Sequence, residues 1–317
     1  MTATYALVGA AGYIAPRHMK AIAETGGRLD LAYDINDSVG IMDQHFPDAA
    51  FFTEFEQFEA HMHARRRAGR GIDYVAICSP NYLHKAHIGA ALRAGADAIC
   101  EKPLVLEPGD LDDIARFEDD TGRKVNTILQ LRLHPAILAL RDRIAAGPAD
   151  RVHEVDLGYF TSRGAWYHSS WKGVVAKSGG IATNIGVHFY DMLSFVFGPL
   201  RTNIVHHRAE DSAAGYLEYE KARVRWVLSI NRAHLPPQTP AGQTTYRSIT
   251  VDGEEVEFSG GFTDLHTESY RSVLAGQGFG LELVRPSIEV VSHIRTAPLE
   301  PGRGEQHPDI GRILANA

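Results

Sequence analysis

Two side chains, those of Lys102 and His188, carry groups that could take part in catalysis. Lys102 stands between the end of an apolar run and Pro103, so its ammonium has a fixed direction and could stabilise an oxygen that gains negative charge. His188 carries an imidazole, which titrates near neutral pH and suits it to accept a proton. Asn184 precedes His188 by four residues, which predicts that both lie on one face of a helix. The alternatives are a solvated lysine and a structural histidine.

A glycine-containing turn near the N-terminus could hold a nucleotide. The segment GAAGYIA, residues 9–15, follows an apolar run and opens a helical pattern, so backbone N–H groups at the helix start can meet a pyrophosphate. Asp34 ends the next apolar run, 22 residues after Gly12, where a carboxylate can accept hydrogen bonds from both ribose hydroxyls. That carboxylate would repel a 2′-phosphate, which favours NAD over NADP. A turn without a ligand is the alternative, and its place in the first strand–helix–strand unit disfavours it.

Two further polar motifs follow apolar runs in the same part of the chain. They are Ser79-Pro80-Asn81 with His84, and Glu101-Lys102-Pro103. Both are predicted at the carboxyl ends of parallel strands, where open α/β sheets bind their ligands. For Asn81 taken on its own, a helix N-cap is the favoured interpretation.

Short apolar runs alternate with helical patterns over the first 130 residues, and a helix is predicted from Pro16 to the glycines at 26 and 27. The runs cover residues 5–8, 29–34, 50–52, 74–78, 98–100 and 125–129. Strands that alternate with helices indicate a parallel sheet covered on both faces. We therefore expect an α/β protein whose residues 1–131 form a doubly wound Rossmann domain.

The pattern changes beyond residue 131. A helix is predicted over 135–146, and the segment 223–231 alternates arginine or polar residues with apolar ones, as in a half-covered antiparallel strand. Asp252-Gly253 predicts a hairpin between 248–251 and 254–258. We expect residues 132–317 to form an α+β domain with an open, mainly antiparallel sheet, one face of which would require a partner subunit if helices do not cover it. Residues 298–317 are predicted to be a loosely held tail.

Composition limits the classes of function and partner. The 317 residues carry 32 Lys and Arg against 39 Asp and Glu, a net charge of −7, which argues against nucleic acid and anionic membranes as partners. The N-terminus lacks the positive region of a signal peptide, and Cys78 and Cys100 are predicted as buried thiols in a reducing cytoplasm. His206-His207 lacks ligand spacing to a Cys or carboxylate pair, so no metal is expected. Residues 65–67, all arginine, are predicted to be a solvated surface.

These motifs, with Gly186-Val187-His188, resemble the Gfo/Idh/MocA family of sugar and cyclitol dehydrogenases. Members join a Rossmann domain to a C-terminal domain whose open antiparallel sheet commonly packs in oligomers. Several longer stretches are similar to one branch, the bacterial UDP-N-acetylglucosaminuronate 3-dehydrogenases. These stretches are GAAGYIAPRH, AYDINDSVGI, ICSPNYLH, TSRGAWY, TNIGVHFYDML, AGYLEYE and GFTDLHT.

The resemblance implies NAD-dependent oxidation of a sugar 3-hydroxyl, with Lys102 and His188 as the catalytic residues. The family pattern has Asp where this chain has Asn184, and an amide can orient the sugar but cannot take its proton. Whether Lys102 or His188 accepts the proton stays open. The cofactor-binding residues expected are Gly9, Ala11, Gly12, Tyr13, Ile14, Asp34, Asn36, Ser79, Asn81, His84, Glu101, Lys102, Gln130 and Trp171.

The implied substrate carries a diphosphate and a carboxylate, so a local cluster of cations is required. Arg163 and Lys172 belong to the loop 162–180 just before His188, and Arg132 closes the last predicted Rossmann strand. An arginine can bind the uronate through a bidentate fork. Aromatic residues of the loop could stack on the ligands or simply pack. The substrate-binding residues expected are Lys102, Arg132, Arg163, Tyr167, Lys172, Asn184 and His188.

The branch also implies a biological setting. Similar enzymes feed the synthesis of diaminated mannuronic acid for lipopolysaccharide O-antigen, and they return their reduced nicotinamide to NAD with 2-oxoglutarate. A cytoplasmic homo-oligomer is expected, with a tetramer favoured. One alternative is a dehydrogenase of another sugar or a cyclitol, and a neutral cyclitol would need no cations such as Arg163. Another is a non-catalytic NAD-binding sensor, which the presence of both Lys102 and His188 disfavours.

Overall fold

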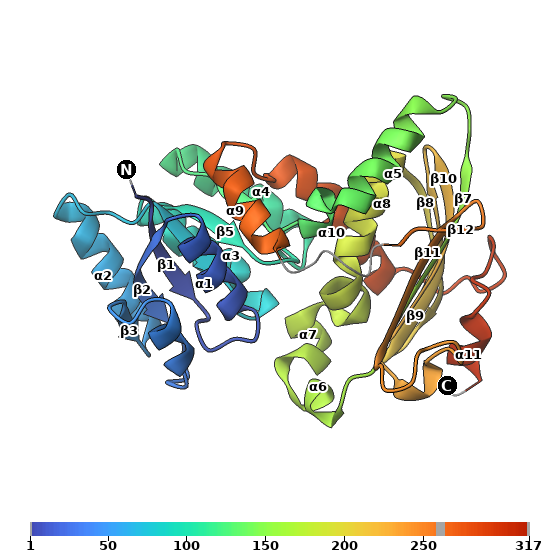
Figure 1. Ribbon diagram of the computed structural model, residues 1–317, viewed down its shortest axis with the longest axis horizontal. Coiled ribbons are helices and arrows are strands. Elements are labelled where there is room, and N and C mark those ends of the chain that lie inside the picture. The colour runs from blue at the N-terminus through green and yellow to red at the C-terminus, as the bar shows by residue number, and fades with distance from the viewer. Residues whose placement is uncertain (1, 258–263, 316–317) are drawn as a thin grey trace. The chain divides into compact units, whose positions relative to one another are not determined.

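The computed structural model describes residues 2–257 and 264–315, which divide into two compact units (Figure 1). Of the described residues, 2–130 and 264–285 form the first unit, and 131–257 and 286–315 form the second. The sequence-based division after residue 131 differs in one segment, because 264–285 packs with the first unit and not with the second. Phe258 of the predicted hairpin and residues 261–263 of GFTDLHT lie outside the described residues.

The first unit is built on a parallel sheet of six strands in the order β3-β2-β1-β4-β5-β6. The strands are β1 (Thr4–Val8), β2 (Arg28–Tyr33), β3 (Ala50–Phe52), β4 (Tyr74–Ile77), β5 (Asp97–Cys100) and β6 (Val125–Thr127). The doubly wound prediction is confirmed. The order reverses between β1 and β4, and ligands bind at the carboxyl ends of the strands at such a switch point.

Helices connect these strands and cover the sheet. They are α1 (Ala15–Glu24), α2 (Phe55–Arg67), α3 (His84–Arg93) and α4 (Pro108–Thr121), with shorter 3₁₀ turns at Gly40–Gln44 and Asn81–Leu83. Two helices from later in the chain join them, α9 (Leu265–Leu274) and the first residues of α10 (Leu281–Thr296). In Figure 1, α9 lies beside α1, and its Tyr270 is fully buried with Tyr5, Met19 and Ile22 in one core cluster. This packing explains why 264–285 belongs to the first unit.

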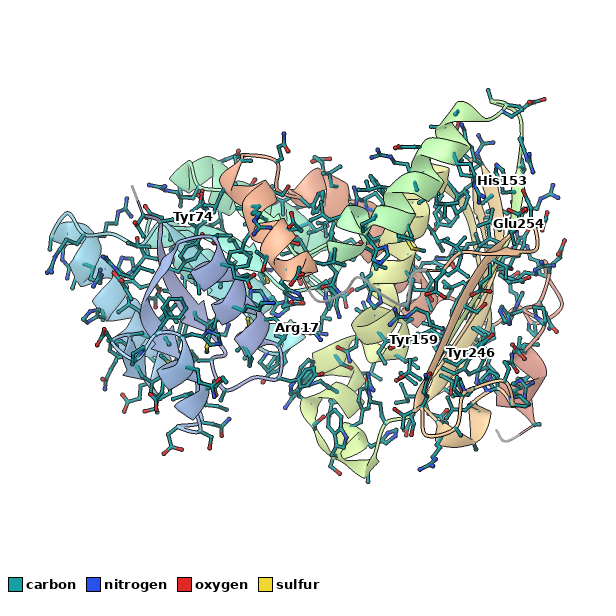
Figure 2. All side chains as sticks on the ribbon, viewed as in Figure 1. Arg17, Tyr74, His153, Tyr159, Tyr246 and Glu254 are labelled. Carbon is teal, nitrogen blue, oxygen red and sulfur yellow. The ribbon has the colours of Figure 1, made fainter. Side chains whose placement is uncertain are left out.

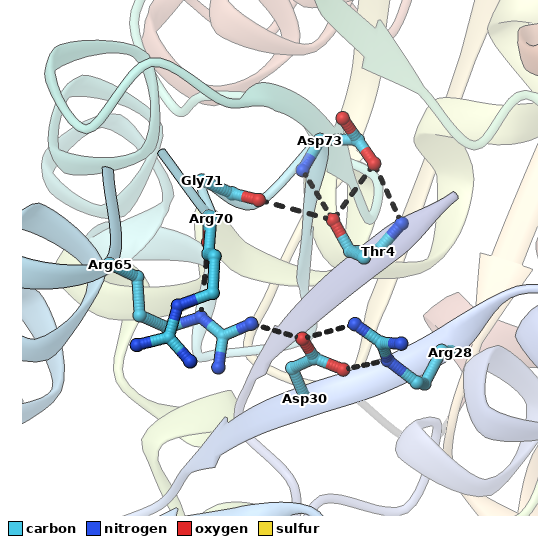
Figure 3. A network of polar contacts seen from close by, with 7 residues as sticks. All are labelled: Thr4, Arg28, Asp30, Arg65, Arg70, Gly71 and Asp73. Carbon is cyan, nitrogen blue, oxygen red and sulfur yellow. Dashed lines mark hydrogen bonds and ion pairs between the residues drawn. The ribbon is translucent and has the colours of Figure 1, made fainter. Parts of the chain in front are cut away.

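Polar contacts fasten the strands at the opposite, amino-terminal edge of the same sheet (Figure 3). The Asp73 carboxylate accepts hydrogen bonds from the backbone N–H and the hydroxyl of Thr4, each at 2.8 Å, so the segment before β4 is tied to β1. Asp30 of β2 pairs with Arg28 and with Arg65 of α2. The prediction that residues 65–67 form a solvated surface is wrong for Arg65, because this ion pair half buries its side chain.

The second unit contains a sheet in the order β12-β11-β7-β10-β9-β8. Its strands are β7 (His153–Thr161), β8 (Leu200–Arg208), β9 (Ser212–Tyr219), β10 (Ala222–Ser229), β11 (Thr245–Val251) and β12 (Glu254–Glu255). All neighbours pair antiparallel except β7 with β10, so the expected mainly antiparallel sheet is confirmed. Figure 2 shows His153 and Glu254 at one end of this sheet and Tyr246 toward the other, as the antiparallel pairing of β11 with β7 requires.

The helices of the second unit are α5 (Pro135–Ala146), α6 (Ala165–Ser169), α7 (Val175–Ser178), α8 (Val187–Phe197), α11 (Ile310–Leu314) and the rest of α10. Short 3₁₀ turns lie at Gln130–Leu133, Trp171–Gly173 and Arg232–His234, and a π-helical turn spans Ala182–Gly186. The helix predicted over 135–146 is confirmed. None of the helices within residues 2–257 and 264–315 has both the length and the apolar character needed to cross a membrane.

The C-terminal segment is packed on the sheet, so the prediction of a loosely held tail is wrong. Ile310 and Ile313 of α11 are buried in a cluster with Phe160 of β7 and Val227 of β10. The backbone N–H of Glu300 donates to the carbonyl of Val205, at 2.8 Å. The tail thus covers apolar surface of the sheet for which the sequence had predicted a partner subunit.

Candidate active site

The turn after β1 is shaped by two glycines. Gly9 has φ +88°, and a Cβ there would lie 2.7 Å from the carbonyl carbon of Cys78 and 2.8 Å from the nitrogen of Ser79. A side chain is excluded both by this contact and by the backbone conformation. A Cβ on Gly12 would lie 3.0 Å from the carbonyl oxygen of Gly9. Gly9 therefore allows the turn after β1 to pack against the turn after β4, and Gly12 allows the turn after β1 to close on itself.

The turn leads into a helix start that suits an anion. Among the described residues, no side chain caps the N-terminus of α1, and Pro16 in its first turn has no N–H to satisfy. The N–H groups of Ala15 and Arg17 donate to the carbonyls of Gly12 and Ile14, at 3.1 and 3.0 Å, so a phosphate here would be met by the N–H groups of Tyr13 and Ile14 just before the helix. Tyr13 is 88% exposed. These features fit a dinucleotide cofactor, and Ala11, Gly12, Tyr13 and Ile14 are the residues that would lie along its pyrophosphate.

Asp34 follows β2 with its carboxylate held in place by backbone groups. Its Oδ2 accepts the N–H of Ala11 and its Oδ1 accepts the N–H of Asn36, both at 2.9 Å. The side-chain amide of Asn36 also donates to Oδ1, at 3.3 Å. The next residue, Ile35, is 76% exposed, which is unusual for an isoleucine. Ile35 was not among the predicted site residues, because an apolar side chain carries no chemical signal in the sequence.

The motif after β4 is organised by two buried histidines. The Oγ of Ser79 lies 2.8 Å from Nδ1 of His87, and burial lowers the pKa of His87 to about 4. The ring nitrogens of His84 lie 2.9 Å from the carbonyl oxygen of Ser79 and 2.8 Å from that of Pro103. Both partners are acceptors, so a neutral ring donates to one of them at a time. His84 therefore joins the two predicted motifs of this edge.

Asn81 is buried and begins the 3₁₀ turn Asn81–Leu83. The N-cap position of α3 is Leu83, so the alternative that Asn81 caps this helix is not supported. Gln130 is half-buried at the end of the same unit, in the turn after β6.

Glu101 continues β5, and the half-buried Lys102 follows it. The Glu101 carboxylate points into the unit, where its Oε1 lies 3.0 Å from Nε2 of His18 and 3.0 Å from Nε2 of His266. Its other oxygen accepts the backbone N–H of Lys102 at 3.2 Å. Burial acts to raise the pKa of Glu101, but the hydrogen bonds from both histidines hold it well below its usual range. The carboxylate is thus engaged inside the protein, which differs from the direct cofactor contact expected for it.

His18, Glu101 and His266 are buried and are also the one grouping of potential metal ligands found within residues 2–257 and 264–315. The sequence did not indicate it, because the three residues are far apart in the chain. Each of its three facing atoms takes part in a hydrogen bond, and Nδ1 of His18 lies 2.8 Å from the hydroxyl of Tyr270. The three side chains therefore belong to a hydrogen-bonded network, and we assign no metal to them.

In the second unit, Asn184 and His188 lie on a distorted helix. Asn184 belongs to the π-helical turn Ala182–Gly186, and His188 to the first turn of α8. Four residues are close to one full turn in both α and π geometry, so the shared helix face of Asn184 and His188 stays a prediction. Single π turns occur frequently at functional sites. The Asn184 amide donates to the hydroxyl of Tyr167 at 2.9 Å, which fixes how the amide faces.

The loop 162–180 holds most of the other predicted substrate residues. Arg163 is half-buried, and its Nη1 donates to the hydroxyl of Thr161 at 3.0 Å. Lys172 places its ammonium 4.2 Å from the ring centre of Trp171 and 5.8 Å from that of Trp166. Tyr167 is buried, and burial raises the pKa of its hydroxyl although Asn184 and Arg163 act to lower it. Cations and aromatic faces thus occur together in one loop.

Arg132 is placed differently from the expectation that it binds substrate. Its guanidinium makes a bidentate pair with Asp191 of α8, with distances of 2.9 and 2.8 Å. Both side chains are buried, and burial raises the pKa of Asp191 although Arg132 acts to lower it. The guanidinium fork is committed to this pair, which anchors the start of the second unit on α8.

Comparisons with known proteins agree with this geometry. The family model described as "Oxidoreductase family, NAD-binding Rossmann fold" matches residues 3–128, and its companion "Oxidoreductase family, C-terminal alpha/beta domain" matches 141–273. The chain belongs to the Gfo/Idh/MocA oxidoreductase family. The first unit is accordingly an NAD-binding Rossmann domain, and the choice of NAD from Asp34 agrees with the family.

Solved structures of one dehydrogenase are similar over nearly the whole chain. The WlbA (WbpB) dehydrogenase of Thermus thermophilus is 52% identical, with a TM-score of 0.93, and the match covers 97% of this chain and 99% of that one. It has been crystallised with NAD and α-ketoglutarate, and with NAD and UDP-GlcNAcA. The WlbA dehydrogenase of Bordetella pertussis shares the fold, at 21% identity and a TM-score of 0.76 over 92% of this chain and 94% of that one.

Curated relatives match over shorter regions. Inositol 2-dehydrogenase of Rhizobium meliloti is 30% identical over 204 residues, 62% of this chain and 56% of that protein. D-glucoside 3-dehydrogenase of Escherichia coli is 28% identical over 182 residues, 49% of this chain and 51% of that protein. This chain thus aligns with little more than half the length of each.

Proposed function

We propose that this protein oxidises the 3-hydroxyl of UDP-N-acetylglucosaminuronate to the 3-keto sugar with NAD as hydride acceptor. The observation that carries the proposal is the 52% identity, over 97% of the chain, with a dehydrogenase that has been crystallised with NAD and with this sugar nucleotide. A match of this extent includes both units, and therefore both the cofactor-binding and the substrate-binding parts.

The cofactor would be held by the first unit. We propose that the N–H groups just before α1 bind the pyrophosphate, that Asp34 binds the ribose, and that the exposed Tyr13 and Ile35 pack on the nucleoside. Ser79, Asn81, His84, Lys102 and Gln130 of this unit complete the proposed set, together with Trp171 of the second unit. NAD, when bound, supplies the acceptor for the hydride from C3 of the sugar.

The protein residues would handle the proton and the developing charge. We assign to the Lys102 ammonium the stabilisation of the oxygen as its bond to hydrogen breaks. His188 is suited to take the hydroxyl proton, because an imidazole accepts one near neutral pH. Asn184 orients the sugar through its amide, which Tyr167 holds in one direction. Which of Lys102 and His188 receives the proton first is a question that their variants would answer.

Substrate recognition would rest on the loop 162–180. Arg163 offers a guanidinium fork to the uronate carboxylate, and Lys172 offers a charge to the diphosphate. The indole faces of Trp166 and Trp171 provide flat surfaces for the sugar or a base. Arg132 contributes indirectly in this scheme, through its pair with Asp191.

We propose that 2-oxoglutarate closes the cycle. It would take up a hydride at its carbonyl carbon and a proton at oxygen, giving 2-hydroxyglutarate and restoring NAD. The α-ketoglutarate in the crystal of the Thermus protein supports this role. The same resemblance supports a place in O-antigen synthesis, before an aminotransferase, and a cytoplasmic homotetramer.

The experiment is to incubate the purified protein with UDP-N-acetylglucosaminuronate and 2-oxoglutarate and to identify products by mass spectrometry. The proposal predicts equal amounts of the 3-keto sugar nucleotide and 2-hydroxyglutarate. A parallel incubation with myo-inositol is the control for a neutral substrate. Turnover of the cyclitol alone, or no product with added NAD or NADP, would contradict the proposal.

A further inference from the structure

The strongest observation outside the assigned roles is the buried network beneath Lys102. It consists of His18 on α1, Glu101 after β5, and His266 and Tyr270 on α9. All four residues belong to the first unit and are at most 8% exposed. None of them has been given a part in the chemistry so far.

The hydrogen bonds define the protonation states of this network. Glu101 is ionised, so Oε1 can only accept, and each histidine must carry its proton on the Nε2 that faces it. Nδ1 of His18 is then an acceptor, and the Tyr270 hydroxyl donates to it at 2.8 Å. Burial lowers the pKa of His18, which agrees with a neutral ring. These contacts are satisfied with a neutral His18 and one buried carboxylate.

The network ends on the backbone of Lys102. The second carboxylate oxygen of Glu101 accepts the Lys102 N–H, at 3.2 Å. One residue further on, the carbonyl of Pro103 lies 2.8 Å from the His84 ring. The backbone on either side of Lys102 is therefore held by buried polar groups. A charged side chain whose own stem is flexible acts reliably only when its anchor is fixed.

We propose that His18, Glu101, His266 and Tyr270 are positioning residues that hold Lys102 in its working geometry, a role that rests on the proposed function of Lys102. In this proposal, α9 has a part in positioning Lys102. Its segment is distant in sequence from Glu101, yet it packs with the Rossmann unit and supplies two of the four network residues. A misplacement of about 1 Å at a reacting group can reduce a rate about 100-fold.

Substitutions at Glu101 separate geometry from charge. Glu101→Ala removes every acceptor and should lower kcat about 100-fold while changing the Kd for NAD less than about threefold. Glu101→Gln keeps the shape, because its amide can donate to both histidines once their tautomers reverse and its oxygen can still accept the Lys102 N–H. It should restore kcat to within about tenfold of the wild type.

A second pair tests the network from α9 in case Glu101→Ala folds poorly. His266→Gln retains an N–H donor and should keep most of the activity, whereas His266→Leu removes it and should lower kcat about tenfold or more. Glu118→Ala is the matched control. Glu118 lies in the same unit and accepts the backbone N–H of Val125 at 2.7 Å, at the start of β6, where Val125 pairs with Ala98 and not with the end of β5 that leads to Lys102. The control should leave kcat unchanged.

Amide hydrogen exchange tests the proposal without any substrate. With NAD bound, exchange at the Lys102 amide should be about tenfold faster in Glu101→Ala than in the wild type and unchanged in Glu118→Ala. An inactive wild type would contradict the proposed function, and the exchange rates would still decide the positioning role. That role is overturned if Lys102 exchange is the same in Glu101→Ala and wild type. It is also overturned if the fall in kcat of Glu101→Ala is no larger than the loss of NAD affinity in the same variant.

Discussion

The two units differ in how their predicted site residues are buried and held. In the nucleotide-binding unit, Asp34, Asn81, His84 and Glu101 are 8%, 5%, 1% and 8% exposed, and Asp34 and Glu101 are oriented by backbone N–H groups. In the second unit, the loop 162–180 carries its cations on long, half-buried side chains, and Trp166 is 56% exposed. A cofactor that is the same in every turnover suits a rigid site. In the proposed function, the choice of substrate is left to the loop 162–180.

The difference has a physical origin in how each group is held. A carboxylate fixed by two backbone N–H groups loses little further entropy when it binds a ligand. Arg163 and Lys172 have long side chains, which lose more rotamer entropy when they are ordered around a ligand. We therefore propose that sequence changes in the loop alter specificity without disturbing the Rossmann unit.

The largest expected effect is on chemistry, from Lys102→Met. Methionine has a similar shape but no charge, so the developing oxyanion loses its cation and kcat should fall about 1000-fold. NAD should still bind with nearly the wild-type Kd, because Asp34 and the start of α1 are untouched. The measurements are NADH formation under single-turnover conditions and NAD titration. Retained activity would remove Lys102 from the mechanism.

The next effect should fall on the rigid nucleotide site, from Gly9→Ala. The new Cβ meets the backbone at Cys78 and Ser79 and adopts an unfavourable φ, so stability should fall by about 1–3 kcal/mol and the Kd for NAD should rise about tenfold or more. The control is Gly26→Ala, which has φ +72° but meets nothing within 4 Å. Thermal unfolding and NAD titration are measured for both variants. Equal NAD affinity in Gly9→Ala and Gly26→Ala would show that the contact of the new Cβ with the backbone at Cys78 and Ser79 is unimportant for NAD binding.

The smallest effect should come from the loop 162–180, in the variant Arg163→Leu. We expect the KM for UDP-N-acetylglucosaminuronate to rise about tenfold, with NAD affinity and kcat within about threefold of wild type, because one charge-assisted contact is lost. Arg223→Leu serves as the control, since Arg223 is exposed and pairs with Glu154 in the same unit. If Arg163→Leu weakens NAD binding and leaves the KM for the sugar nucleotide unchanged, the assignment of cofactor binding to the first unit and substrate binding to the second is wrong.

The sequence predicted the Rossmann unit closely because its signals are local. The strand at 50–52 was placed at its observed bounds, and Gly9 and Asp34 lie where the fingerprint requires them; the helix at 135–146 of the second unit was placed equally well. Each of these depends on residues within one strand–turn–helix segment, where hydrophobic periodicity and glycine are informative.

What the sequence missed depends on contacts between distant segments. The return of α9 to the first unit, the His18–Glu101–His266 network and the Arg132–Asp191 pair join residues that no local pattern connects. The C-terminal tail is polar enough to suggest a loose end, and only its packing on the sheet gives Ile310 and Ile313 a partner surface. The π turn at Ala182–Gly186 has no composition signal of its own.

The path of the hydride tests the central claim most directly. UDP-N-acetylglucosaminuronate carrying deuterium at C3 is incubated with the holoenzyme and unlabelled 2-oxoglutarate, and the products are analysed by mass spectrometry. The account predicts that deuterium leaves the sugar and appears at C2 of 2-hydroxyglutarate. Deuterium retained in the sugar while 2-hydroxyglutarate forms without label would contradict it.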